Sequence, residues 1–206
     1  MRNKLRSFYL FLLVAIIFQA CSTDTSKLQK SNVTKLVYPN HKFRTFLNKF
    51  KLLNLPFTLI LGETNLALER KLNANDNLFI KYKETGDIYA YGMLPDTMDT
   101  FKIIWLQPAD DYIPILTTFT RSGKKINSEF IGVGGCGVDC CFSCNEHITV
   151  KQDLSIFAVD SIKTCECDSS GPKENTTIKY IVYKKGRILV GGKIRMSNEQ
   201  QKSIKY

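Results

Sequence analysis

Residues 176–195 read TTIKYIVYKKGRILVGGKIR, two runs of β-branched and aromatic residues that meet at a short basic segment containing glycine. Alternate positions of the first run form two faces, with Ile178, Tyr180 and Val182 against Lys179, Ile181 and Tyr183. A period of two in residues of this kind predicts a β-strand. We therefore expect strands at 176–184 and 187–195, joined by a hairpin turn at 184–187 that contains Gly186.

The same pattern recurs along most of the chain. Further strands are expected at 57–61, 78–83, 87–93, 101–106, 112–120, 125–131, 147–151 and 154–159, with a short one at 35–38. Turns are predicted at 121–124 and 151–153. Neighbouring strands joined by such short turns form an antiparallel meander. Pro108 and Pro114 place the strand at 112–120 on a sheet edge, because proline cannot donate a ladder hydrogen bond.

A helix is predicted ahead of these strands. Residues 41–53 read HKFRTFLNKFKLL and place apolar side chains at helical spacing: Phe43, Phe46, Leu47, Phe50 and either Leu53 or Leu52. This stripe is expected to pack on the sheet rather than to lie on a membrane or in a partner's groove. Residues 63–76 are read as a short helix or an irregular segment. The predicted fold class is α+β, mainly β: an antiparallel meander or curved sheet, braced by disulfides, with an N-terminal helix packed on it.

Composition supports a folded chain and excludes several classes of protein. The chain has 206 residues, 44% of them hydrophobic, and no low-complexity tract, which is typical of one globular domain. Collagen-like, coiled-coil and multi-span membrane proteins are excluded on the same grounds. Only two histidines occur, His41 and His147, and no phosphate-binding loop or dinucleotide fingerprint is present. No cofactor is therefore expected.

The N-terminus has the order of a secretory signal. Residues 1–21 read MRNKLRSFYLFLLVAIIFQAC, with basic residues, an apolar run and then a small residue. The apolar run from Phe8 to Ala20 has 13 residues, whereas a membrane-spanning helix needs about 20. Phe18-Gln19-Ala20-Cys21 resembles the lipobox of bacterial lipoproteins, in the relaxed form of Bacteroidetes-type members.

This resemblance implies that Cys21 is acylated and becomes the first residue of the mature protein, which anchors the chain to a lipid bilayer. It divides the chain into a signal peptide at 1–20, a polar tether at 21–40 and a single globular domain at 41–206. Ser22 resembles the residue that follows the cysteine in lipoproteins sorted to the outer membrane. The expected location is the bacterial cell envelope, lipid-anchored at the outer membrane, on either its periplasmic or its surface face.

Charge argues against a nucleic-acid partner. The formal charge of +10 falls to +7 when residues 1–20 are removed, with 26 basic and 19 acidic residues left. The lysines are spread along the chain and form no stripe interleaved with stacking aromatics, so no nucleic acid is expected to bind. A solvated basic surface near anionic lipid or polysaccharide fits the envelope location better.

The other cysteines are clustered between residues 136 and 167: Cys136, Cys140, Cys141, Cys144, Cys165 and Cys167. An even number of cysteines in an exported chain predicts disulfide bonds. We expect Cys165 and Cys167 each to bond to a cysteine of the 136–144 loop, and the two left over in that loop to pair together. Adjacent Cys140 and Cys141 then have different partners.

Two other interpretations of the cluster are weighed. Four of the cysteines, or three with His147, could bind Zn²⁺, but the spacing does not match a zinc ribbon or knuckle, and no metal site is expected. Cys141 and Cys144 have the C-x-x-C form of thiol–disulfide oxidoreductases, although the expected hairpins differ from the strand–helix context of that motif.

No catalytic residue is predicted. The acidic residues of the expected loops are interpreted as solvated: Glu63, Asp96, Asp99, Asp110 and Asp111. His147, beside Glu146, is a candidate base for Ser143, but no nucleophile-elbow pattern surrounds them. Trp105 lies in an apolar run and is expected to pack in the core.

The sequence therefore predicts a membrane-anchored envelope lipoprotein, a binding or structural module without catalytic activity, whose partner is an envelope protein or a glycan. An inhibitor or immunity-type protein falls within this class. The alternative is an envelope hydrolase or thiol-redox enzyme that uses His147, loop carboxylates, or Cys141 and Cys144.

Overall fold

The computed structural model describes residues 40–61, 70–82, 86–95, 99–109, 112–134, 137 and 139–204, which all belong to one compact unit. The predicted signal peptide, Cys21, the tether up to residue 39 and the strand expected at 35–38 lie outside these ranges. The described part of the chain is mainly β and its sheets are antiparallel, which confirms the predicted fold class.

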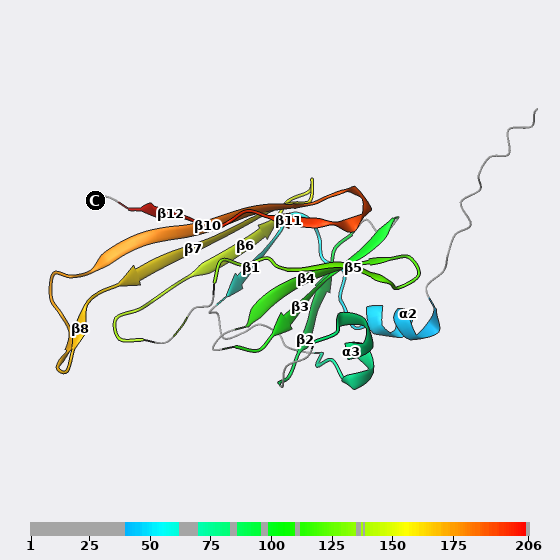
Figure 1. Cartoon of the computed structure of the whole chain (residues 1–206), viewed down its shortest axis with the longest axis horizontal. Coiled ribbons are helices and arrows are strands. Elements are labelled where there is room, and N and C mark those ends of the chain that lie inside the picture. The colour runs from blue at the N-terminus through cyan, green and yellow to red at the C-terminus, as the bar shows by residue number, and fades with distance from the viewer. Residues whose placement is uncertain are drawn as a thin grey trace, which may run out of the picture. The chain divides into compact units, whose positions relative to one another are not determined.

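The elements follow one another along the chain as Figure 1 shows. Their bounds are α2 (His41–Leu47), β1 (Phe57–Leu61), α3 (Ala74–Ile80), β2 (Tyr89–Met93), β3 (Thr100–Gln107), β4 (Ile113–Thr120), β5 (Lys125–Phe130), β6 (Glu146–Val150), β7 (Ser155–Thr164), β8 (Cys167–Asp168), β9 (Gly171–Pro172), β10 (Ile178–Ile188), the 3₁₀ turn η1 (Val190–Gly192), β11 (Ile194–Met196) and β12 (Gln200–Ser203).

The longer strands divide between two sheets. One sheet has the order β1-β6-β7-β10-β11, and β12 also pairs with β10; the other has the order β2-β3-β4-β5. Apolar side chains from both sheets meet in one buried cluster, with Leu59 and Ile148 from the first sheet and Ile104 and Leu116 from the second. The hydroxyl of Thr118 in β4 donates to the carbonyl oxygen of Gly192 over 2.6 Å and adds a polar link.

The four-stranded sheet is buried on its other face as well. There Phe101, Ile103 and Phe119 pack against Phe43 and Phe46 of α2 in a second buried cluster, which also includes Ile80 of α3. The other sheet covers one face of this sheet and the helices cover the other. Residues of β3 are therefore buried at nearly every position. The layer of helices on this sheet brings α2 and α3 together (Figure 1).

The helices differ from the prediction in length and position. The predicted stripe is confirmed with Leu53 as its last member, because its side chains are buried, whereas Leu52 is 61% exposed. However, α2 ends at Leu47 and the following residues turn. Leu78–Ile80, predicted to begin a strand, lie in α3, because Asn73 and Asp76 cap its start. None of the helices in the described ranges combines the length and the apolar character that crossing a bilayer requires.

The predicted edge position of residues 112–120 is wrong, because β4 lies between β3 and β5. Pro114 is tolerated there because it lies near the strand start. Its position pairs with Leu106 on β3, whereas pairing with β5 begins at Ile115. Its carbonyl oxygen still accepts a hydrogen bond from Ile131, and only a donor at the end of the ladder is lost.

The predicted hairpin at 184–187 is also wrong. Residues 178–188 form one continuous strand, and Gly186 pairs with Ile156 of β7 and Met196 of β11. A Cβ on Gly186 would lie only 2.7 Å from the carbonyl oxygen of Arg195, so glycine is needed there because another backbone approaches closely. The turn comes later, at Gly191 and Gly192, which both have positive φ.

Candidate functional site

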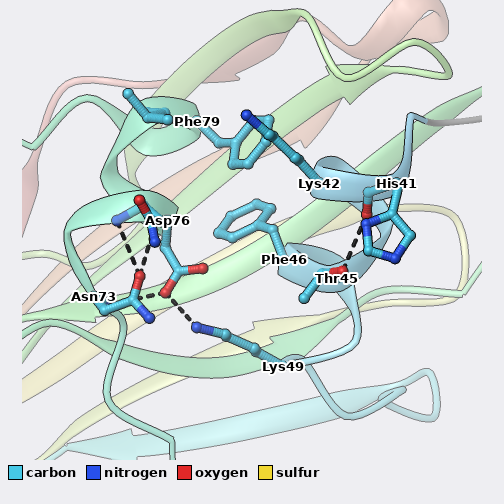
Figure 2. A pocket seen from close by; sticks show the side chains of 10 residues that line it. His41, Lys42, Thr45, Phe46, Lys49, Asn73, Asp76 and Phe79 are labelled. Atoms are coloured by element: carbon cyan, nitrogen blue, oxygen red, sulfur yellow. Dashed lines mark hydrogen bonds and ion pairs between the residues drawn. The ribbon is translucent and has the colours of Figure 1, made fainter.

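A pocket of about 400 Å³ lies between the two helices of the described chain (Figure 2). Two chain segments about 30 residues apart form it, one from α2 and one from α3. Its lining combines aromatic rings, amides and charged groups: His41, Lys42, Thr45, Phe46, Lys49, Asn73, Asn75, Asp76, Leu78 and Phe79.

Local hydrogen bonds fix where each helix begins. The side-chain oxygen of Asn40 accepts from the backbone N–H of Phe43 over 2.8 Å at the start of α2. At the start of α3, Asn73 and Asp76 form a reciprocal capping box. The far end of α3 is held by Lys125 of β5, whose Nζ donates to the carbonyl oxygen of Ile80 over 2.9 Å. The pocket therefore lies between elements with defined ends.

Two aromatic side chains lie between the helices. The rings of Phe46 and Phe79 are stacked with centroids 4.9 Å apart. Figure 2 shows Phe46 between the polar side chains of the two helices and Phe79 beside Lys42. Phe46 is buried and Phe79 is partly exposed. The pocket thus offers an apolar surface at Phe79 inside a polar rim.

An ion pair joins the two helices across the pocket. The Nζ of Lys49 lies 2.5 Å from Oδ2 of Asp76, and the same carboxylate oxygen accepts from the backbone N–H of Asn73 over 2.7 Å. The Asp76 side chain is only 6% exposed, so its charge is compensated within the fold. The hydroxyl of Thr45 donates to the carbonyl oxygen of His41, not to an imidazole. This arrangement can bind a ligand, and none of these contacts pairs a nucleophile with a base.

The candidate base His147 is not brought to Ser143. His147 is a half-buried residue of β6 that pairs with Ile60 and Val159. Ser143 pairs with Lys163 in the register that continues along β6 and β7. The two residues are therefore four positions apart on an extended segment, or about 13 Å at the rise of a β-strand. This separation does not allow direct proton transfer.

The predicted loop acids do not gather at the pocket. Asp99 is exposed and lines a separate cavity beside Asp153 and Arg187. The other four, Glu63, Asp96, Asp110 and Asp111, lie outside the described residues. Trp105 packs in the core as predicted, 4% exposed, and its Nε1 donates to Thr117 over 2.9 Å.

Disulfide bonds join Cys140 to Cys167 and Cys141 to Cys165. Each cysteine of the later segment thus reaches into the loop, and the adjacent cysteines have different partners, as predicted. Cys144 is also disulfide-bonded, and Cys136 lies outside the described residues. Cys141 is bonded to Cys165, so the C-x-x-C pair does not form a disulfide of its own. Among the described residues, no three His, Cys, Asp or Glu side chains come together as metal ligands would.

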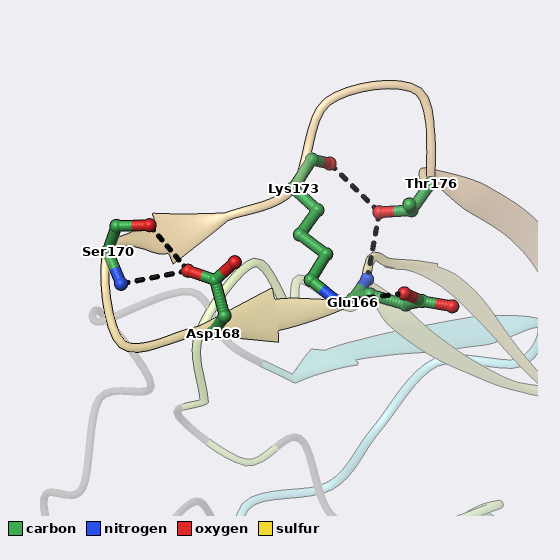
Figure 3. Close-up of polar contacts among 5 residues, drawn as sticks. All are labelled: Glu166, Asp168, Ser170, Lys173 and Thr176. Carbon is green, nitrogen blue, oxygen red and sulfur yellow. Dashed lines mark hydrogen bonds and ion pairs between the residues drawn. The ribbon is translucent and has the colours of Figure 1, made fainter.

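β8 and β9 form a small hairpin (Figure 3). The disulfides of Cys165 and Cys167 join its first strand and the residues before it to the 140–141 segment. The carboxylate of Asp168 accepts from both the N–H and the hydroxyl of Ser170. Thr176 donates to the carbonyl oxygen of Lys173 and accepts from the N–H of Glu166. These hydrogen bonds are exposed to solvent. The hairpin is therefore stabilised by hydrogen bonds and disulfides rather than by an apolar core.

Sequence reasoning missed a pair of buried carboxyl groups. Glu146 of β6 and Asp160 of β7 face each other across the ladder and are 0% and 3% exposed. Oε1 of Glu146 accepts from the N–H of Val133, and Oε2 has no partner among the described residues. Burial raises the pKa of Glu146 to about 7, and Asp160 adds to this rise. Burial also raises the pKa of Asp160.

A signal for this pair was present in the strand pattern. Glu146 occupies the same face of β6 as Ile148 and Val150, and Asp160 follows Ala158 on the inner face of β7. An acidic residue in phase with buried apolar residues is a candidate for a perturbed pKa. The pair is closed to solvent and lines neither the pocket between the helices nor the cavity beside Asp153 and Arg187, which argues against direct contact with a substrate at either place.

No protein-family model, curated protein or solved structure matches this chain.

Proposed function

We propose that this protein is a lipid-anchored component of the bacterial cell envelope that acts as a binding module rather than as an enzyme. The observation that carries the proposal is the disulfide bonding of Cys140 and Cys141 to Cys167 and Cys165. Structural disulfides are typical of oxidising compartments such as the bacterial periplasm and cell surface. They are independent of the signal-like N-terminus, which points to the same destination.

Acylation of Cys21 would supply the anchor. Each buried methylene contributes about 0.8 kcal/mol, and two or more acyl chains hold a protein on a bilayer stably. Ser22 supports sorting to the outer membrane by its resemblance to other lipoproteins. The domain itself then needs no membrane-spanning element.

The pocket between α2 and α3 is the binding site that we assign to the module. Its partly exposed ring at Phe79 can contact an apolar face of a ligand, and the polar rim around it can hydrogen-bond to hydroxyl or amide groups. An envelope glycan and a peptide segment of an envelope protein both present these groups. Among the described residues that line this pocket, no hydrogen bond joins a nucleophile to a base, which supports binding over catalysis.

Metabolic labelling tests the anchor. The full chain is expressed in a bacterial host with an alkyne-tagged palmitate, beside Cys21→Ala. The unchanged chain should incorporate label and stay in the membrane fraction, whereas the Cys21→Ala chain should take up none. Label that persists in Cys21→Ala, or no label in either chain, would contradict the proposal.

A further inference from the structure

We propose that one face of the sheet formed by β1, β6, β7, β10, β11 and β12 binds an acidic polysaccharide. This is the face that points away from the four-stranded sheet, and we call it the outer sheet face. Its central residues are Phe157, Val159, Lys163, Tyr183, Lys185 and Lys202. None of them lines the pocket between α2 and α3, so this is a second binding surface and depends on neither the pocket nor the lipid anchor.

The strand register shows that these side chains share one face. Directly paired residues of an antiparallel ladder point to the same side of the sheet. Val159 pairs with Tyr183, Phe157 pairs with Lys185, and Lys202 pairs with Ile181, all without a shift in register. Lys163 lies on the same side of β7 as Phe157 and Val159, because alternate residues of a strand point the same way.

The opposite side of the same strands faces the core. Ile156 and Ala158 of β7 are 2% and 0% exposed and belong to the cluster between the two sheets. Phe157, Val159 and Tyr183 are only half-buried and belong to neither buried cluster of the described chain. The described helices pack on the four-stranded sheet instead (Figure 1). The outer sheet face therefore presents apolar side chains that no described helix covers.

Two aromatic rings lie in the middle of this face. The ring centroids of Phe157 and Tyr183 are 6.1 Å apart, and the Nζ of Lys185 lies 5.7 Å from the centroid of the Tyr183 ring. The face of an aromatic ring is negative, so it attracts the slightly positive C–H groups of a sugar ring. Because the rings come from paired strands, the fold holds them in place before a ligand binds.

Positive charges lie on either side of the rings along the strands. Lys163, Lys185 and Lys202 are exposed, and no carboxylate of the described residues forms an ion pair with them. Lys163 pairs with Lys179, six positions before Lys185 on β10, so the charges extend over about 20 Å at the rise of a β-strand. The outer positions of β6, β7 and β10 include no acidic residue. A single anion cannot reach both ends of this surface, whereas a linear polyanion can.

Charge and burial favour a polysaccharide as the occupant. A second copy of the chain would place lysines against lysines, which costs binding energy. Surfaces that enter a bilayer expose large apolar side chains, whereas the apolar residues of this face are half-buried. A linear acidic polysaccharide supplies carboxylates repeated along its length for the lysines and sugar rings between them for Phe157 and Tyr183.

Calorimetric titration with hexagalacturonic acid tests the proposal on the purified full chain in neutral detergent. The fully methyl-esterified hexamer is the matched ligand, because it keeps the sugar rings and lacks the charges. The acid should bind about tenfold more tightly than the ester at low salt, since three exposed ion pairs each contribute modestly. High salt should remove most of this difference, because it screens exposed charges.

Matched variants locate the site. Lys163→Gln/Lys202→Gln should weaken binding of the acid about fivefold and leave the ester unaffected. Lys51→Gln/Lys124→Gln makes the same change in charge at exposed positions outside this sheet and should affect neither ligand. Tyr183→Ala should weaken both ligands. Tyr180→Ala, on the other side of the same strand, should weaken neither, and thermal unfolding checks that each variant folds.

Several results would overturn the proposal. These are no binding of the acid, equal losses in the two lysine variants, or equal losses in the two tyrosine variants. Loss of binding in Lys42→Gln instead would place the ligand in the pocket. Tighter binding of polyglutamate than of the hexamer would assign the outer sheet face to an acidic protein, and binding to phosphatidylglycerol vesicles alone would assign it to lipid.

Discussion

Glu146 shows how one buried side chain makes the fold sensitive to pH. Its carboxylate accepts a hydrogen bond from the backbone N–H of Val133, a residue that follows β5. Glu146 also lies opposite Asp160 in the pairing of β6 with β7. His147 and Lys184 are the nearby groups whose charges favour ionisation, His147 at Asp160 and Lys184 at Glu146. They do not outweigh burial, because the pKa of both acids is raised.

The sign of the effect on stability follows from the direction of the shift. The pKa of Glu146 is about 7 in the fold against an ordinary value of 4.5, so the folded state binds the proton more tightly than the unfolded state. The stabilisation is fully present below pH 4.5 and is lost as pH rises through 7. Wild-type protein should lose about 2 kcal/mol of unfolding free energy between pH 5 and pH 8 from this group.

Glu146→Gln should remove most of that loss. The amide oxygen can still accept from Val133, and the amide nitrogen would occupy the position of the unpartnered oxygen without a charge. Urea unfolding of the unreduced protein at pH 5 and pH 8 measures the difference. A variant whose stability falls with pH as steeply as that of the wild type would contradict the assignment.

At the scale of elements, the two disulfides replace a core for the β8–β9 hairpin. The bond between Cys140 and Cys167 spans 27 residues, and closing a loop of that length contributes about 3 kcal/mol in the chain-entropy model. Because Cys141–Cys165 still closes the enclosed loop, Cys140→Ser/Cys167→Ser frees only the few residues between the two bonds and should lower the unfolding free energy by less, about 1–2 kcal/mol. Amide hydrogen exchange should accelerate in residues 166–176 but not in β3. Unchanged exchange in the hairpin would show that its hydrogen bonds suffice.

The pairing of β10 with β11 depends on a missing side chain. Gly186→Ala would bring a Cβ to 2.1 Å from the sulfur of Met196 and 2.7 Å from the carbonyl oxygen of Arg195. Because the second contact is with backbone, the variant should lose about 1–3 kcal/mol. Gly134→Ala is a matched control, since its Cβ would meet nothing within 4 Å. Thermal unfolding compares the two, and equal transition temperatures would argue against the close approach.

These elements also show what local sequence could predict. Strands β1, β3 and β7 were expected because alternating or continuous apolar residues report burial directly. The positions of Gly186 and Pro114 were predicted wrongly, because each residue type occurs in two settings. Glycine occurs in turns and also inside strands where another backbone approaches closely, and proline occurs on edge strands and also near the start of a central strand. The choice depends on neighbouring strands that are distant in sequence.

The pocket could not be predicted for the same reason. Its two sides come from α2 and α3, whose meeting depends on both helices covering one face of the four-stranded sheet. The short apolar run at 78–80 resembles a strand unless the capping pair of Asn73 and Asp76 is recognised. The disulfide arrangement was predicted in outline only: Cys165 and Cys167 were expected to bond into the 136–144 loop, but the sequence did not assign which loop cysteine each one takes.

At the scale of the whole molecule, the chain combines a lipoprotein-like N-terminus with a disulfide-braced β domain. We infer that the first supplies attachment, and that the second supplies a pocket for a partner. Attachment and binding are separable by mutation, because Cys21 and the pocket residues lie at different places in the chain. The anchor is the claim on which the other assignments to the envelope depend.

Intact-mass spectrometry of the protein purified from membranes tests that claim most directly. The account predicts a chain that begins at Cys21, carries the added mass of acyl groups, and binds no thiol reagent at Cys140, Cys141, Cys165 or Cys167 before reduction. A chain that keeps residues 1–20, or lacks acyl mass at Cys21, or reacts at these cysteines without reduction, would contradict it.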